Sequence, residues 1–323
     1  MIPYTRKTLP NGLTVVVNRD RASKLAAVNI LYRVGARNEN PARTGFAHLF
    51  EHLMFRGTRA VENFDLPVQM ASGDNNAFTN NDYTDFYITL PKDNLETALW
   101  LESDRMEGLD ITPAKLEAEK KVVIEEFRQR YLNQPYGDQT MLLRALAYKV
   151  HPYRWAAIGL ATDHIAGATL ADVESFYRAH YRPSNAILSI SADMEEERML
   201  ELAEKWFAPL ADHPSATAAI PQEPVQTQAR RQEVERDVPA STVTVAYHMC
   251  ARTKPDFYTA DLVSDLLSGG DSGRLYTHLV KERNLLSSVN AYITGDVDPG
   301  LFVFTGQLLP GVTPEAAEAA FRE

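Results

Sequence analysis

The segment His48-Leu49-Phe50-Glu51-His52 constrains this chain more than any other part of its sequence. In a helix, residues four apart lie one turn apart on one face, so His48 and His52 would direct both imidazoles the same way. Two imidazoles in this arrangement can bind one Zn²⁺, and Glu51 beside them is a candidate general base. The pattern H-x-x-E-H therefore predicts a short helix that carries part of a metal site.

A catalytic zinc site needs a third protein ligand and an open position for water. A predicted helix over 113–133 contains Glu119 and Glu126, which are seven residues apart and lie on one helical face. We predict Glu126 as the third metal ligand and Glu119 as the group that hydrogen-bonds a ligating histidine. A helix rich in Glu and Lys is more often a solvated surface, and a histidine pair is more often ordinary packing. The apolar residues around His48 argue against exposure, because buried His and Glu need partners.

The order of strand and helix patterns predicts an α+β fold, made of two sandwich-type domains with mainly antiparallel sheets. The predicted domains are 1–208, which bears the metal site, and 231–323, which is of the same kind but incomplete because the chain ends inside a helix. A Pro-rich linker over 209–230 separates them. Five further expectations concern local structure: a helix from Gly45 to Met54, a turn at 73–76, one strand over 77–90, and helices over 137–148 and 272–284.

Charge and composition exclude several classes of protein. The net charge of −10 disfavours nucleic-acid binding, which needs a basic surface. Cys250 is the only cysteine, so an intrachain disulfide and a thiolate-rich metal site are excluded. No apolar run is long enough to span a membrane, and the N-terminus has no signal-peptide pattern. We expect a cytoplasmic protein, or a periplasmic one if a leader has been removed.

Several motifs together resemble the pitrilysin and mitochondrial processing peptidase family of zinc endopeptidases. The matching segments appear in the order of that family and cover nearly the whole chain: 44–58 around the two histidines, 76–79, Thr84 and Tyr87, the Glu119/Glu126 pair, 151–153, 181–185 and 273–275. The resemblance implies one Zn²⁺ per chain, held by His48, His52 and Glu126, with Glu51 as the base. It also implies a peptide substrate that pairs as an added strand along Asn76, Ala77, Phe78 and Thr79.

The sequence departs from the family in its second half. Active single-chain relatives use an arginine and a tyrosine seven residues apart, and an ungapped alignment places Val280 and Ser287 there. We therefore predict the catalytic subunit of a homo- or heterodimer, in which a related subunit supplies the Arg/Tyr pair. The alternatives are a non-catalytic scaffold or chaperone-like subunit of the same fold, and a purely structural zinc, which usually has four protein ligands and favours cysteine.

Overall fold

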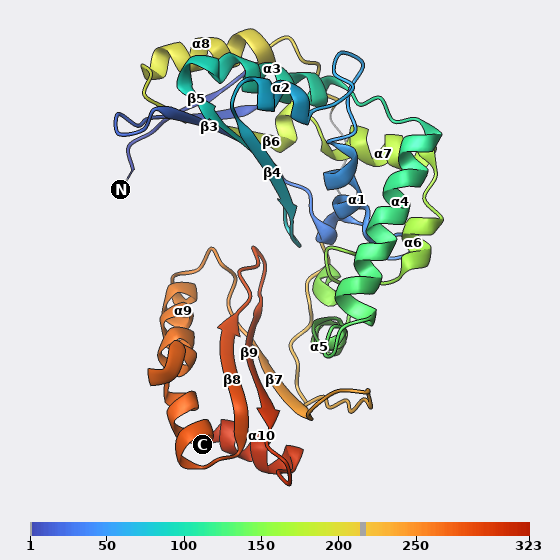
Figure 1. The fold of residues 1–323 in the computed structure, drawn as a ribbon, viewed down its shortest axis with the longest axis vertical. Helices are drawn as coiled ribbons and strands as arrows, with labels where there is room; N and C mark the ends of the chain where they lie inside the picture. Colours follow the sequence, from blue (N-terminus) through green and yellow to red (C-terminus); the bar gives the residue numbers. More distant parts are fainter. Residues whose placement is uncertain (1, 214–217) are drawn as a thin grey trace. The chain divides into compact units, whose positions relative to one another are not determined.

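The computed structural model describes residues 2–213 and 218–323, which form two compact units. The first unit contains Met1–Arg130 and Val150–Glu223, and the second contains Tyr131–Lys149 and Pro224–Glu323. Each unit combines helices with a β-sheet, which confirms the predicted α+β class (Figure 1). The predicted domains, 1–208 and 231–323, stay a prediction. The second compact unit also contains residues 131–149, which lie inside the first predicted domain. Part of the expected linker, residues 214–217, lies outside the described residues.

A mixed sheet forms the centre of the first unit. Its described strands are β1 (Thr5–Thr8), β2 (Thr14–Arg19), β3 (Leu25–Tyr32), β4 (Asp74–Thr79), β5 (Thr84–Pro91) and β6 (Ala186–Ala192). They lie in the order β1-β2-β6-β3-β5-β4, with β2 and β6 parallel and the other neighbours antiparallel. Alternate side chains of β3, from Ala26 to Tyr32, are buried, as expected for a strand with one covered face. The strand β4 is the last in this order, and no other strand among the described residues pairs with its outer edge.

Helices cover this sheet and carry the predicted site. They are α1 (Phe46–Leu53), α2 (Asp65–Met70), α3 (Leu95–Glu107), α4 (Pro113–Phe127), α6 (Thr162–Ala166), α7 (Leu170–His180) and α8 (Glu196–Phe207). Helices α3 and α8 pack on the strands and on each other, whereas α1 packs against α4 and beside β4. Thr112 starts α4 by accepting a hydrogen bond from the Lys115 N–H, with Pro113 at the first helical position. A π-helical turn, Arg128–Leu132, follows α4.

The predicted turn at 73–76 is wrong, and so is the single strand over 77–90. Residues 74–76 belong to β4, and the chain reverses at 80–83 instead. Asn80 makes this reversal because its Oδ1 accepts hydrogen bonds from the N–H groups of Asp82 and Tyr83, at 2.8 and 2.9 Å. An edge strand tolerates the polar sequence Asp74-Asn75-Asn76 because one of its sides and half of its residues face solvent.

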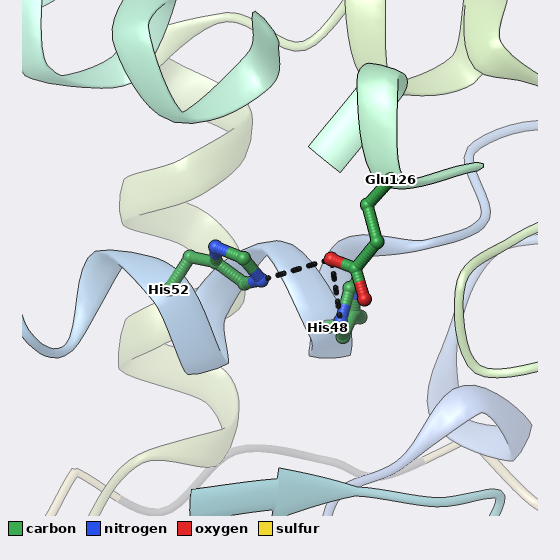
Figure 2. A group of neighbouring side chains, drawn as sticks. All are labelled: His48, His52 and Glu126. Carbon is green, nitrogen blue, oxygen red and sulfur yellow. Dashed lines mark ion pairs between the residues drawn. The ribbon is translucent and has the colours of Figure 1, made fainter. Parts of the chain in front are cut away.

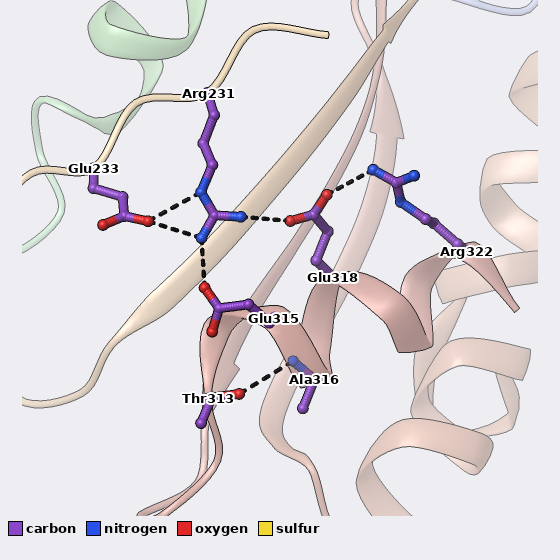
Figure 3. Close-up of polar contacts among 7 residues, drawn as sticks. All are labelled: Arg231, Glu233, Thr313, Glu315, Ala316, Glu318 and Arg322. Carbon is purple, nitrogen blue, oxygen red and sulfur yellow. Dashed lines mark hydrogen bonds and ion pairs between the residues drawn. The ribbon is translucent and has the colours of Figure 1, made fainter.

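The second unit is built on the antiparallel strands β7 (Thr242–His248), β9 (Leu301–Leu308) and β8 (Leu286–Ile293), in that order. Its described α-helices are α5 (Gln139–Ala147), α9 (Pro255–Ser268) and α10 (Pro314–Arg322), and a π-helix, Tyr276–Glu282, occupies part of the helix expected over 272–284. Arg231, in the segment before β7, forms ion pairs with Glu315 and Glu318 of α10. It also forms an ion pair with Glu233 (Figure 3).

Among the described residues, no helix has both the length and the apolar character that crossing a bilayer requires. The compartment stays a prediction.

Candidate metal centre

The structure brings the three predicted metal ligands together in the first unit. His48 and His52 project from one side of α1, and Glu126 reaches them from the last turn of α4 (Figure 2). One ligand atom from each residue lies within 4.8 Å of the other two. The helix expected from Gly45 to Met54 is present as α1, and its periodicity sets the two imidazoles one turn apart.

The distances between these atoms fit a metal ion better than direct hydrogen bonds. Glu126 Oε2 lies 3.6 Å from His48 Nε2 and 3.4 Å from His52 Nε2. Nitrogen and oxygen ligands at zinc bond lengths lie about 3.3 Å apart in a tetrahedron. A charged hydrogen bond between histidine and carboxylate would instead close to about 2.8 Å. The donor set of two imidazoles and one carboxylate is also that of known catalytic zinc sites, so these residues fit Zn²⁺.

Glu119 lies behind His52, on the side away from Glu126. Its Oε2 is 3.3 Å from His52 Nδ1, and its Oε1 is 2.6 Å from Nε of Arg56. Only 1% of the Glu119 side chain is exposed to solvent. Burial acts to raise the pKa of Glu119, but His52 and Arg56 outweigh burial and lower it. An ionised Glu119 at this distance favours the tautomer of His52 that carries its proton on Nδ1, which would leave Nε2 free to bind a metal.

His48 has a different environment from His52. Burial, together with the charges of His52 and Arg130, lowers the pKa of His48 to about 3, so its imidazole is neutral and keeps a lone pair for a metal. In the described part of the chain, no protein atom forms a hydrogen bond with the buried Nδ1 of His48. For His52, burial lowers the pKa, but the larger combined effect of Glu119 and Glu126 raises it above its usual value.

Arg130 separates the roles of the two oxygens of Glu126. Its Nη2 lies 2.9 Å from Glu126 Oε1, while Oε2 faces the imidazoles. Arg130 follows Glu126 by four residues, on the π-helical turn after α4. The guanidinium therefore favours one orientation of the carboxylate, in which a single oxygen is presented to the metal position.

Glu51 lies on α1 between the two histidines in sequence. Burial raises its pKa, which a hydrogen bond with the Thr79 side chain and the charge of His52 partly offset. A carboxylate with a raised pKa accepts a proton more readily near neutral pH than an ordinary glutamate does. Thr79, which we predicted only as a substrate-binding residue, thus also contacts the candidate base.

The remaining predicted residues, Asn76, Ala77 and Phe78, lie with Thr79 on the edge strand β4, beside α1. Phe78 is 44% exposed. Val280 and Ser287 lie in the second unit, on the π-helix Tyr276–Glu282 and at the start of β8.

Sequence reasoning missed three polar residues near the site: Arg56, Arg130 and Glu39. The four-residue spacing from Glu126 to Arg130 was a usable signal, since such pairs meet on a helix. Arg56 follows the metal motif by four residues, but nothing in the sequence links it to Glu119. Glu39 accepts hydrogen bonds from backbone N–H groups at the start of α1, and no short-range pattern indicates this.

Comparisons with known proteins match both halves of the chain. A family model described as "Insulinase (Peptidase family M16)" matches residues 14–156, and one described as "Peptidase M16 inactive domain" matches residues 167–323. The chain is 33% identical over 317 residues to the zinc protease PqqE of Helicobacter pylori, covering 96% of this chain and 71% of that protein. It is 26% identical to a probable mitochondrial-processing peptidase subunit beta of Arabidopsis thaliana, covering 93% of this chain and 59% of that protein.

Solved structures give the same result for the fold. The crystal structure of a protease from Helicobacter pylori superposes with a TM-score of 0.94 at 31% identity, over all of this chain and 79% of that one. Crystalline pitrilysin superposes with a TM-score of 0.74 at 17% identity, over 99% of this chain and 35% of that one, and so supports the fold alone. This chain spans 59–71% of the length of the two sequence relatives described above.

Proposed function

This chain belongs to peptidase family M16, and on that premise we propose that it is a zinc-dependent endopeptidase subunit whose metal is held by His48, His52 and Glu126. The observation that carries the proposal is the meeting of these three side chains at ligand-to-ligand distances. Zinc bound there would supply a Lewis acid that makes water more acidic and polarises a peptide carbonyl.

In this proposal Glu51 moves the proton. Its carboxylate takes a proton from the attacking water and later delivers it to the nitrogen of the leaving amine. The raised pKa of Glu51 supports the first step, because a carboxylate with a raised pKa is a stronger base than an ordinary glutamate. Thr79 positions the Glu51 side chain through their hydrogen bond.

We propose that the substrate is a peptide or an unfolded segment that pairs along Asn76, Ala77, Phe78 and Thr79. Two observations support this: no other strand in the described part of the chain pairs with the outer edge of β4, and β4 lies beside α1. Pairing of this kind recognises the backbone through main-chain hydrogen bonds, and the exposed Phe78 can add an apolar contact. Sequence preference among substrates is therefore expected to be broad.

We further propose that turnover requires a related subunit, as a homo- or heterodimer, because Val280 and Ser287 stand where active single-chain relatives have arginine and tyrosine. The rival is a scaffold or chaperone-like subunit of the same fold, a binding protein rather than an enzyme. The description "inactive domain" for the model that matches residues 167–323 is compatible with either reading, since it concerns the half without the metal ligands. The complete ligand set favours the peptidase.

The test is the substitution Glu51→Gln, measured for zinc content and for cleavage of an unstructured peptide, alone and with candidate partner subunits. We expect the variant to bind one zinc per chain as the wild type does, and to cleave no peptide. The exposed Glu117→Gln, on α4, serves as the control and should keep both properties. A wild-type chain with no zinc, or a Glu51→Gln chain that still cleaves, would contradict the proposal.

A further inference from the structure

A buried carboxylate lies at the start of the helix that carries the metal ligands. Glu39 is 6% exposed; its Oε2 accepts a hydrogen bond from the Gly45 N–H at 2.8 Å, and its Oε1 accepts one from the Ala47 N–H at 2.9 Å. Burial raises the pKa of Glu39 and so disfavours its charged form, but each of its oxygens accepts from a backbone N–H, which is the arrangement of a carboxylate and not of a protonated acid. Burying a carboxyl group costs free energy unless hydrogen bonds compensate for the lost water, and here the two backbone N–H groups provide them.

Helix α1 needs an external group at this end. It has eight residues, and a helix so short is not stable by itself. Its first residues have N–H groups without partners inside the helix, and the capping position is Gly45, which has no side chain and a φ of +90°. Glu39 supplies the missing acceptor from outside the helix, and Ala47, one of its two partners, directly precedes His48.

The two histidines are not held in the same way. Glu119 contacts Nδ1 of His52 and orients that ring directly. At His48, no protein atom among the described residues bonds to Nδ1. The direction of the His48 imidazole therefore depends on where the backbone of the first turn of α1 lies.

Glu39 is itself anchored to the other side of the site. It follows a 3-10 turn, Ala36–Asn38, whose first two N–H groups bond to the carbonyl oxygens of Asn80 and Asn81 at 3.1 and 2.9 Å. These two residues form the turn that follows Thr79 on β4. The first turn of α1 and the end of the substrate edge are thus joined through the Ala36–Glu39 segment.

We propose that Glu39 is a positioning residue of the metal centre: its carboxylate fixes the first turn of α1, and with it the His48 imidazole, relative to Glu126. The inference rests on the proposed zinc site, and it goes beyond that site by assigning the orientation of His48 to a residue that does not contact the metal. Glu39 acts through the backbone of Gly45 and Ala47, in the way that Glu119 acts through Nδ1 of His52.

The test compares the full chain with its Glu39→Gln variant. Glutamine has the shape of glutamate, but its amide can offer an oxygen to only one of the two N–H groups and turns a donor toward the other. The readouts are the zinc dissociation constant, measured against a chelator of known affinity, and the visible absorption bands of the Co²⁺-substituted protein, which report the ligand geometry. We expect the zinc dissociation constant to rise about 10- to 100-fold, as for other groups that orient ligands, and the Co²⁺ bands to shift.

Val17→Ala is the matched control for lost stability. Val17 is fully buried on β2, whose neighbours in the sheet are β1 and β6. We expect this variant to unfold at a lower temperature than the wild type and to keep the wild-type zinc affinity and Co²⁺ bands. If Glu39→Gln does not fold, Glu39→Asp, whose shorter side chain cannot reach both N–H groups, is judged by the same criteria.

The outcomes separate this inference from the proposed function. A wild-type chain that binds zinc, with a Glu39 variant that binds it equally well and with the same bands, overturns the positioning role alone. Equal losses of zinc affinity in Val17→Ala and Glu39→Gln also overturn it, because the effect would then be one of stability. A wild-type chain that binds no zinc overturns the proposed function and this inference with it. Zinc binding without peptidase activity leaves the role of Glu39 supported.

Discussion

Removing the carboxylate of Glu119 tests whether the orientation of His52 controls zinc affinity. Glu119 Oε2 lies 3.3 Å from His52 Nδ1, and the side chain is 1% exposed. Losing a group that orients a ligating histidine typically weakens metal binding 10- to 100-fold, or about 1.4–2.7 kcal/mol.

The chemistry of the replacement decides where in this range a variant falls. In Glu119→Gln the amide oxygen can still accept the Nδ1 proton of His52, but the amide NH₂ then faces the guanidinium of Arg56. Arg56 is half exposed and can turn into water, so no buried charge is left unpaired. We expect a loss of about tenfold for Glu119→Gln and closer to 100-fold for Glu119→Ala, which has no acceptor.

The assay is competition for zinc between the protein and a chelator of known affinity at pH 7.5. Glu117→Gln is the control: Glu117 lies on the same helix, is 59% exposed and pairs with Lys120. Because Arg56 acts through Glu119, Arg56→Gln should weaken binding in the wild type but have little further effect in Glu119→Ala. A zinc dissociation constant for Glu119→Ala within about twofold of the wild type would refute the reasoning.

Three further predictions concern stability. Removing zinc with a chelator should lower the melting temperature of the first unit, because a ligand that binds the folded state stabilises it by mass action. The decrease should be about 8–16 °C if the free zinc concentration had been 1,000 times the dissociation constant. An unchanged melting temperature would contradict the proposed metal site. Burial raises the pKa of Asp85 to about 6, so the stability associated with its protonated form is lost as the pH rises from about 4 to 6. Asp85→Asn should therefore raise the melting temperature at pH 7.5 and change it little at pH 3.5. A larger increase at pH 3.5 than at pH 7.5 would contradict this prediction. Arg231→Ala should lower the melting temperature of the second unit only slightly, and less still in about 1 M NaCl, because its ion pairs with Glu233, Glu315 and Glu318 lie at the surface (Figure 3).

Helical periodicity made the ligand set predictable from the sequence. The four-residue spacing of His48 and His52 and the seven-residue spacing of Glu119 and Glu126 each select one face of a helix. Only the contact between α1 and α4 had to be supplied by the fold, and the apolar residues around His48 made burial of that face the natural outcome. The structure brings the four side chains together, while their roles in binding and catalysis stay a proposal.

The role proposed for Glu39, unlike that of Glu119, could not be predicted from the sequence, and neither could the strand β4. Glu39 acts on N–H groups six and eight residues away, through a turn whose conformation depends on the distant residues Asn80 and Asn81. The strand β4 was mistaken for a turn at 74–76 because polar residues at a sheet edge have the composition of a loop. For Glu39 the decisive partners, Asn80 and Asn81, are remote in sequence, so local patterns carry no information about them. The strand β4 pairs with the neighbouring strand β5, and only its polar composition hid it.

The proposed metal site and the positions expected to need a partner subunit lie in different units of the chain. The proposed metal ligands belong to the first unit, as do Glu51, Glu119, Glu39 and the edge strand β4, so zinc affinity should be a property of that unit. Val280 and Ser287, which we predict at the positions of the arginine and tyrosine of active relatives, belong to the second unit. If a related subunit supplies those groups, it should raise the rate of peptide cleavage without changing the zinc dissociation constant, because it adds contacts to the substrate and none to the metal ligands. A partner that instead tightened zinc binding would mean that the metal centre is completed by assembly, and the separation argued from the positions of these residues would be wrong.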